Sequence, residues 1–110
     1  MDIAVRKAGS AVVVSVSGRI DAVTAPEFES RFAEILGQGD TRFIMELSGL
    51  EYISSVGLRA MLSAAKRVGQ LPGKLAFIGL QGYPREVFQM AGFLSILTVF
   101  PSEAEALAKM

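Results

Sequence analysis

Residues 51–62 read Glu51-Tyr-Ile-Ser-Ser-Val-Gly-Leu-Arg-Ala-Met-Leu62 and join the end of a buried strand to an amphipathic helix. The helix is indicated by apolar side chains at helical spacing, namely Leu58, Met61, Leu62, Ala65 and Val68. The first N–H groups of a helix have no partner within the helix and lie at the positive end of its dipole. Two serines and a glycine stand at this junction, which is therefore the most exposed place for chemistry in the chain.

Strands and helices alternate on both sides of this junction. Alternating apolar residues between positions 3 and 17 predict two strands joined by a hairpin. Thr24-Ala-Pro-Glu27 has the pattern of a capping box, with Thr24 as the N-cap of a helix. By the same reasoning, strands are expected at residues 42–47, 74–78 and 96–100, and helices at 24–36, 54–69, 84–91 and from 102 onward.

The resulting order, β-β-α-β-α-β-α-β-α, predicts an α/β fold in a single domain over residues 1–110. Strands that alternate with helices favour a mixed, mostly parallel sheet with the helices packed against it. The N-terminal hairpin adds an antiparallel pair at one edge. Ligands and partners of such folds meet the carboxyl ends of the strands, so the segments that follow those ends are the candidate sites.

Composition excludes several classes of function. The chain has eleven basic and eleven acidic residues and no basic stripe, so a nucleic-acid partner is not expected. It contains no cysteine and no histidine, which removes thiolate chemistry, the commonest general base and the commonest metal ligand. No apolar run approaches the roughly 18 residues that span a bilayer. We therefore expect a cytoplasmic protein without membrane insertion, metal or cofactor.

Ser54 and Ser55 have two interpretations at the start of the helix. One of them is an ordinary N-cap, or one of them carries a functional group such as a phosphate. A cap needs only one hydroxyl, but two are present. A capping box would also need Glu or Gln three residues after the cap, and the residues there are Gly57 (after Ser54) and Leu58 (after Ser55). Gly57 itself costs about 1 kcal/mol relative to alanine in a helix, which indicates either tight packing or a close approach of another surface.

A second junction, Gly18–Thr24, follows the second strand of the hairpin. Asp21 lies in its centre, where an aspartate is usually a solvated loop residue or a local hydrogen-bond acceptor. Arg59 lies beside the two serines and is most simply a surface charge.

An enzymatic reading finds little support. A nucleophilic serine needs an activating base, and without histidine only a lysine or a carboxylate could serve. Ser63-Ala-Ala-Lys66 has the Ser-x-x-Lys spacing but lies within the expected helix, and no Gly-x-Ser-x-Gly, P-loop or metal-binding spacing occurs. We therefore expect a protein without catalytic residues.

The chain resembles the STAS domains, specifically the stand-alone bacterial anti-sigma factor antagonists. Four stretches carry the likeness and cover nearly the whole chain in the order of the family: Val14-Ser-Val-Ser-Gly-Arg-Ile-Asp-Ala-Val-Thr-Ala-Pro-Glu27, Phe43-Ile-Met-Glu-Leu-Ser-Gly-Leu-Glu-Tyr-Ile-Ser-Ser-Val-Gly-Leu-Arg59, Gly73-Lys-Leu-Ala-Phe-Ile-Gly-Leu80 and Arg85-Glu-Val-Phe-Gln-Met-Ala-Gly-Phe93.

The resemblance implies a partner-switching protein. In such proteins the unphosphorylated form binds an anti-sigma factor that is also a serine kinase of the GHKL ATPase type, phosphorylation blocks the binding, and a serine phosphatase resets the switch. The acceptor position matches Ser55, with Ser54 as the alternative. The implied partner-binding residues are Asp21, Thr24, Ser54, Ser55, Val56, Gly57, Leu58 and Arg59.

The chain departs from the family at three positions. Ser54 stands where the best-known members have aspartate, Val56 where they often have serine, threonine or alanine, and Glu46 where aspartate is common. Two other functions remain open: an accessory subunit of a transporter ATPase complex, and a module that senses a small ligand or nucleotide.

Overall fold

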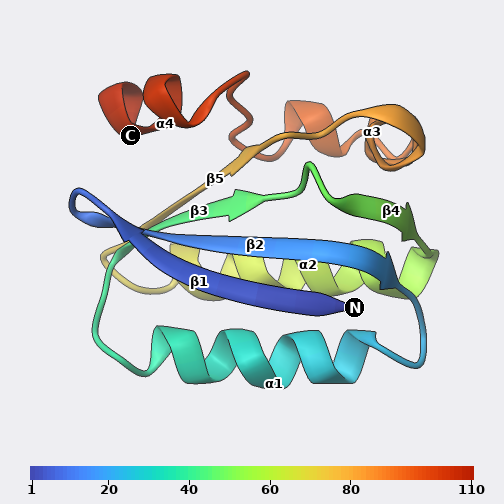
Figure 1. Ribbon diagram of the computed structural model, residues 1–110, viewed down its shortest axis with the longest axis horizontal. Helices are drawn as coiled ribbons and strands as arrows, with labels where there is room; N and C mark the ends of the chain where they lie inside the picture. The colour runs from blue at the N-terminus through green and yellow to red at the C-terminus, as the bar shows by residue number, and fades with distance from the viewer.

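A computed structural model describes residues 1–110 and contains a five-stranded sheet with helices on both of its faces (Figure 1). Its elements are β1 (Asp2–Ala8), β2 (Ala11–Ile20), α1 (Ala25–Leu36), β3 (Arg42–Glu46), β4 (Leu50–Ile53), α2 (Ser55–Gly69), β5 (Lys74–Ile78), α3 (Gly82–Met90), a short 3-10 helix η1 (Phe93–Ser95) and α4 (Glu103–Lys109).

The sheet is mixed and mostly parallel, as the sequence predicts. β1 pairs antiparallel with β2 through the N-terminal hairpin, with Ile3 opposite Val16. β2 pairs parallel with β3, and β3 pairs parallel with β5, so the strand order is β1-β2-β3-β5. β4 lies outside this order and pairs parallel with the last residues of β2.

β4 is a strand that the sequence analysis assigned to the loop after residue 47. β2 pairs with β3 only up to Ser15, opposite Glu46, where β3 ends. The end of β2 would then have an open side, and β4 fills it with Gly18 opposite Leu50 and Ile20 opposite Ile53. Four residues are too few for a clear alternating pattern, which is why the sequence alone did not reveal this strand.

The last strand, expected at residues 96–100, is reduced to a single parallel bridge between Val99 and Phe77 of β5. The Phe77 N–H donates to Thr98 O at 2.8 Å, and the Phe100 N–H donates to Phe77 O at 2.9 Å. Gly79 directly follows β5 with φ of 76°, a conformation that ends the strand just beyond this bridge.

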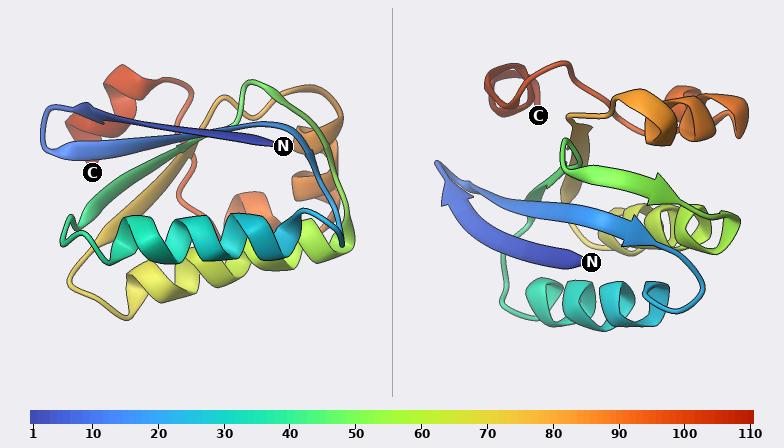
Figure 2. Two further views of the ribbon diagram at one scale, coloured as in Figure 1. Left: turned by 60° about the horizontal axis from the view of Figure 1, so that its bottom comes forward. Right: turned by 45° about the vertical axis from the view of Figure 1, so that its right-hand side comes forward.

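Two helices cover one face of the sheet, and α4 lies on the other. α1 and α2 run side by side against the face that carries Val12, Val14 and Val16 (Figure 2). Phe28 of α1 and Met61 of α2 are fully buried in this layer. The opposite face is smaller and is covered by Ala106 of α4, in a cluster with Ala11, Val13, Ile44, Ala76 and Ile78.

α3 packs beside β4 and completes the core at the end of the sheet. Its Phe88 is fully buried and meets Phe77 edge to face, with ring centroids 6.3 Å apart. No helix in the structure combines the length and the apolar composition that crossing a bilayer requires.

Candidate functional site

The structure brings the two candidate junctions together at one edge of the sheet. Ile20 and Ile53, the last residues of β2 and β4, lie opposite one another, and the Ser54 N–H donates to Ile20 O at 2.9 Å. Asp21 follows the first strand and Ser54 the second, so both segments leave the sheet at the same place. In Figure 1 the arrowheads of β2 and β4 both point to the right, the side on which α1 and α2 begin.

Ser54 is the N-cap of α2. Its backbone is extended (φ −90°, ψ 175°), and its Oγ accepts a hydrogen bond from the Gly57 N–H at 3.1 Å. This geometry satisfies one of the free N–H groups at the helix start. The hydroxyl of Ser54 is therefore engaged in holding the fold.

Ser55 is the first residue of α2, and its side chain is exposed and forms no hydrogen bond within the chain. Because Ser54 already serves as the cap, the Ser55 hydroxyl has no structural task. It lies at the end of the helix whose N–H groups favour an anion. No carboxylate or amine is hydrogen-bonded to this hydroxyl, as the activation of a nucleophilic serine would require.

This division of labour predicts different costs for two alanine substitutions. Ser54→Ala is expected to lower the free energy of unfolding by about 1 kcal/mol, because the Gly57 N–H loses its acceptor. Ser55→Ala is expected to change it by less than about 0.5 kcal/mol, because an exposed hydroxyl without a partner is removed. Urea denaturation of both variants beside the wild type measures the difference. Equal losses in the two variants would contradict the assignment of the cap.

Asp21 organises the turn that leads into α1. Its Oδ1 accepts hydrogen bonds from the Val23 N–H at 3.0 Å and the Thr24 N–H at 3.1 Å, and its carbonyl accepts from the Ala25 N–H at 2.8 Å. The common role of a loop aspartate, that of a local acceptor, is therefore present here. This role also fixes the path of the chain beside the serines.

Thr24 does not cap α1 as the capping-box pattern predicts. Its backbone is already helical (φ −93°, ψ −19°), and its hydroxyl makes no capping hydrogen bond. The hydroxyl instead accepts from the Asp21 N–H at 2.9 Å and lies 3.0 Å from Arg19 O. The physical reason is that Asp21 supplies the acceptor for this turn, so Thr24 Oγ1 is turned back toward β2.

These hydrogen bonds lower the pKa of Asp21 below its ordinary value of 3.8. The Thr24 N–H is the largest cause; desolvation opposes it, and the Val23 N–H, the Thr24 hydroxyl and the charge of Arg19 add to the lowering. Because the folded pKa lies below the unfolded one, the ionised carboxylate stabilises the fold at neutral pH. That contribution is lost as the pH falls through the lowered pKa.

We therefore expect Asp21→Asn to be less stable than the wild type at neutral pH. The difference between the two free energies of unfolding should stay constant down to about pH 5 and then shrink as the wild-type carboxylate takes up its proton. Urea denaturation of both proteins over a series of pH values checks this. A difference that stays unchanged into strong acid would mean that the charge of Asp21 contributes nothing.

Two of the implied partner-binding residues, Gly57 and Leu58, lie beneath the surface. Leu58 is 8% exposed, and Gly57 is buried against the end of β2. A Cβ atom on Gly57 would lie 2.8 Å from Ile20 O and 2.8 Å from Ile53 Cγ1. Tight packing of helix against sheet therefore explains this glycine. Val56 is half-buried and Arg59 is exposed.

The sequence analysis missed a stack of side chains next to this edge. The Arg19 guanidinium carbon lies 4.2 Å from the centre of the Tyr52 ring, and Tyr52 stacks on Tyr83 with centroids 5.7 Å apart and planes 7° from parallel. Arg19 and Tyr83 are exposed. The three residues come from β2, β4 and α3, so only recognition of β4 as a strand could have indicated that they meet.

Comparisons with known proteins agree on one family and one fold. The family model of the STAS domain matches residues 2–106. The protein BtrV of Bordetella bronchiseptica, assigned as an anti-sigma factor antagonist, is 34% identical over 108 residues, which cover 98% of this chain and 93% of BtrV.

Solved structures of such proteins share the fold. An anti-sigma factor antagonist from Mycobacterium paratuberculosis is 26% identical, with a TM-score of 0.86 over 97% of this chain and 91% of that one. The phosphorylated form of the Bacillus cell-fate determinant SpoIIAA has a TM-score of 0.71 over 98% of both chains at 19% identity.

Proposed function

The chain belongs to the STAS domain family, and from this premise we propose that it is an anti-sigma factor antagonist switched by phosphorylation of Ser55. In its unphosphorylated form it binds an anti-sigma factor that is also a serine kinase of the GHKL type and so releases that partner's target. Phosphorylation ends the binding, and a serine phosphatase restores it, all in the cytoplasm. The chain itself carries no catalytic residue. The names of its relatives support this function.

The observation that carries the proposal is the contrast between the two serines. Ser54 is engaged as the N-cap through the Gly57 N–H, whereas Ser55 is exposed and forms no hydrogen bond. A kinase needs an accessible hydroxyl that can be modified without breaking a hydrogen bond that stabilises the fold. Ser55 meets this condition and Ser54 does not.

The fold can accept a phosphate on Ser55 without rearrangement. A phosphoserine carries about −1.5 to −2 charges at neutral pH, and the free N–H groups at a helix start favour such a charge. Arg59, one turn further along the exposed side of α2, adds a positive charge near it. SpoIIAA, which shares this fold, is known in both phosphorylated and unphosphorylated forms.

The effect of the phosphate would instead fall on the partner interface. The proposed interface comprises Asp21, Thr24, Ser55, Val56 and Arg59 at the surface, with Ser54, Gly57 and Leu58 supporting it from below. A partner that fits an uncharged hydroxyl must desolvate a dianion once Ser55 is phosphorylated, and its affinity falls. Two states with different affinities suffice for a switch, so no refolding is needed.

The phosphorylation site can be tested without knowing the kinase. Wild type, Ser54→Ala and Ser55→Ala are incubated with ATP in a lysate of the native cell, recovered, and examined by intact mass and fragment mass spectrometry. We expect one added phosphate on the wild type and on Ser54→Ala, and none on Ser55→Ala. Phosphorylation of Ser55→Ala at the wild-type rate would overturn the assignment.

A further inference from the structure

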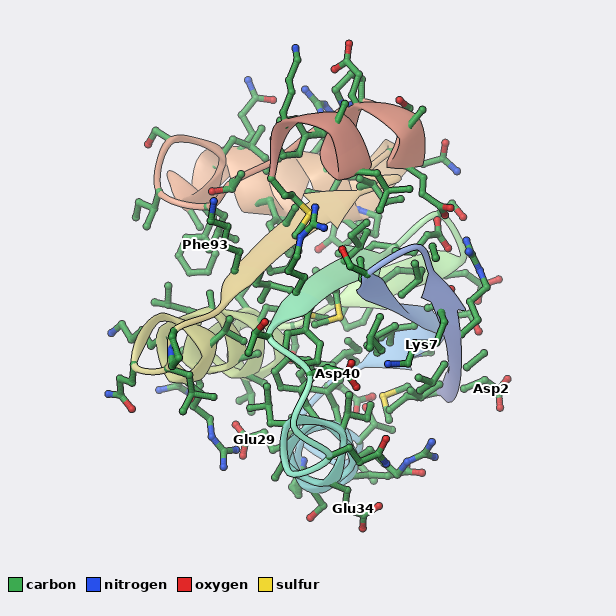
Figure 3. All side chains as sticks on the ribbon, turned by 90° about the vertical axis from the view of Figure 1, so that its left-hand side faces the viewer. Asp2, Lys7, Glu29, Glu34, Asp40 and Phe93 are labelled. Carbon is green, nitrogen blue, oxygen red and sulfur yellow. The ribbon has the colours of Figure 1, made fainter.

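A cavity of about 470 Å³ lies at the end of the molecule opposite the surface around Ser54 and Ser55, which is called the serine surface below. It opens between the C-terminal part of α2, the edge of β5, the segment 96–100 and the end of α4. Its volume falls in the range of about 300–1,000 Å³ that is typical of small-molecule sites. Figure 3 views the protein from this end, where β3 and β5 begin.

Hydrophobic side chains line the cavity from several sides. Eight of its thirteen lining residues are hydrophobic. They come from all its walls and include Val68 of α2, Leu75 and Phe77 of β5, and Ile96, Leu97 and Phe100 of the following segment. Ile96 is 65% exposed, which leaves it free to cover a ligand.

One backbone unit in the wall lacks a partner. The Lys74 N–H donates to Thr41 O beside β3, and the Phe77 N–H donates to Thr98 O on the opposite side. Because alternate residues of a strand point their backbone groups to opposite sides, Leu75 faces the same side as Phe77. The segment 96–100 has only its one bridge to β5, at Val99, so no backbone hydrogen bond from it reaches Leu75.

The charged side chains in the lining are two lysines. Lys74 and Lys109 are both exposed, no acidic side chain lines the cavity, and neither lysine forms a salt bridge. The ion pairs nearby use other cations: Lys7 pairs with Asp40, as Figure 3 shows, and Arg6 pairs with Glu103. The cavity therefore has two lysines at its rim that no acidic side chain pairs with.

We infer that this cavity binds an amphipathic carboxylate, with its acyl chain among the apolar residues and its head group near Lys74, Lys109 and the Leu75 N–H. An added peptide strand is a poorer fit, because a strand needs a run of free backbone groups along one edge and the free stretch of β5 beside the cavity is limited to Leu75. The inference is independent of the phosphorylation of Ser55, which lies at the carboxyl end of the sheet.

The test uses decanoate and its cationic counterpart decyltrimethylammonium, both below their critical micelle concentrations, titrated into the ¹⁵N-labelled full chain. We expect decanoate to shift the amide signals of Gly69, Leu75 and Thr98 in a saturable way. Decyltrimethylammonium should bind about 10-fold more weakly than decanoate, because Lys74 and Lys109 attract the carboxylate but repel the cationic head group. No saturable shift, equal binding of both probes, or shifts confined to the serine surface would overturn the inference.

Two variants separate the head-group and chain contacts. The double variant Lys74→Glu/Lys109→Glu should bind decanoate about 10-fold more weakly, whereas Lys66→Glu on the exposed side of α2 should bind like the wild type. Gly69→Leu should also lose about 10-fold by occupying the space, and it should fold, because a Cβ atom at Gly69 meets no atom within 4 Å. Unchanged affinity in both the double variant and Gly69→Leu would overturn the site.

The source of the carboxylate is decided by a separate measurement. A free acid enters the cavity from solution, whereas a lipid would hold the protein on a bilayer. Sedimentation with phosphatidylglycerol vesicles should leave the chain in the supernatant. Co-sedimentation that is lost in Lys74→Glu/Lys109→Glu would overturn the assignment to a free acid.

Discussion

Phosphorylation of Ser55 is expected to weaken capture of the partner about 100-fold, within the 5- to 150-fold range of typical coupling energies. Ser55→Asp, with one charge in place of nearly two, should weaken it about 10-fold, and Ser55→Ala should bind like the wild type. The reason is that Ser55 is exposed at the edge where β2 and β4 end. A new negative charge there must be desolvated when a surface docks.

The measurement is a pull-down from the native cell lysate, read by quantitative mass spectrometry. Wild type, Ser55→Ala and Ser55→Asp serve as baits, and Ser102→Asp is the matched control. Ser102 lies at another helix start, as the N-cap of α4 on the opposite face of the sheet, and its hydroxyl accepts from the Glu105 N–H. Aspartate caps a helix as well as serine does, so this variant adds the same charge without harming the fold.

Each outcome of this experiment has a distinct meaning. A serine kinase that binds wild type, Ser55→Ala and Ser102→Asp but is depleted from Ser55→Asp supports the switch and identifies the partner. Equal depletion from Ser102→Asp would mean that net charge, and not the serine surface, governs binding. A transporter ATPase captured equally by all baits would replace the proposed function with that of an accessory subunit.

The sequence predicted the fold class, and it indicated where the candidate site lies, because both inferences depend on local signals. The alternating pattern of β2 and the helical spacing of α2 can both be recognised from one sequence. Parallel strands then bring their carboxyl ends to one edge of the sheet. The pair of serines marked the junction before the structure was known. Which serine caps the helix could not be read from the pattern, because the answer depends on the hydrogen bond from Gly57 to Ser54 Oγ.

The features that escaped prediction depend on contacts between distant segments. β4 exists because the end of β2 lacks a neighbour beyond Ser15, which no four-residue pattern reveals. Thr24 lost its expected role because its hydroxyl is used within the preceding turn, where it accepts from the Asp21 N–H and donates to Arg19 O. The burial of Gly57 follows from the approach of α2 to Ile20, and helix propensity alone could not decide between this packing and an exposed contact.

Gly57→Ala is expected to destabilise the protein by about 2 kcal/mol, although alanine is the better helix former by about 1 kcal/mol. The added Cβ would lie 2.8 Å from Ile20 O and 2.9 Å from Ile20 Cγ2. The Ile20 carbonyl cannot yield, because it accepts the Ser54 N–H at 2.9 Å and so ties the start of α2 to β2. Overpacking of this kind costs about 1–3 kcal/mol, and a backbone neighbour sets the cost at the upper end.

Gly69→Ala is the matched control on the same helix, where the added Cβ meets no atom within 4 Å. Because there is no clash, only the higher helix propensity of alanine over glycine acts, and this variant should be more stable than the wild type by about 0.5 kcal/mol. Urea denaturation should therefore give shifts of opposite sign for the two variants. Similar shifts would mean that α2 can move away from β2 without cost.

The same contact has a consequence for the switch. If the approach of Gly57 to Ile20 fixes where α2 begins, it also fixes where Ser55 is presented to a kinase. Gly57→Ala should therefore be phosphorylated more slowly than the wild type at a temperature where it remains folded, whereas Gly69→Ala should be phosphorylated at the wild-type rate. If Gly57→Ala is destabilised but is phosphorylated at the wild-type rate, Gly57 serves only the packing of α2 against β2 and does not position Ser55.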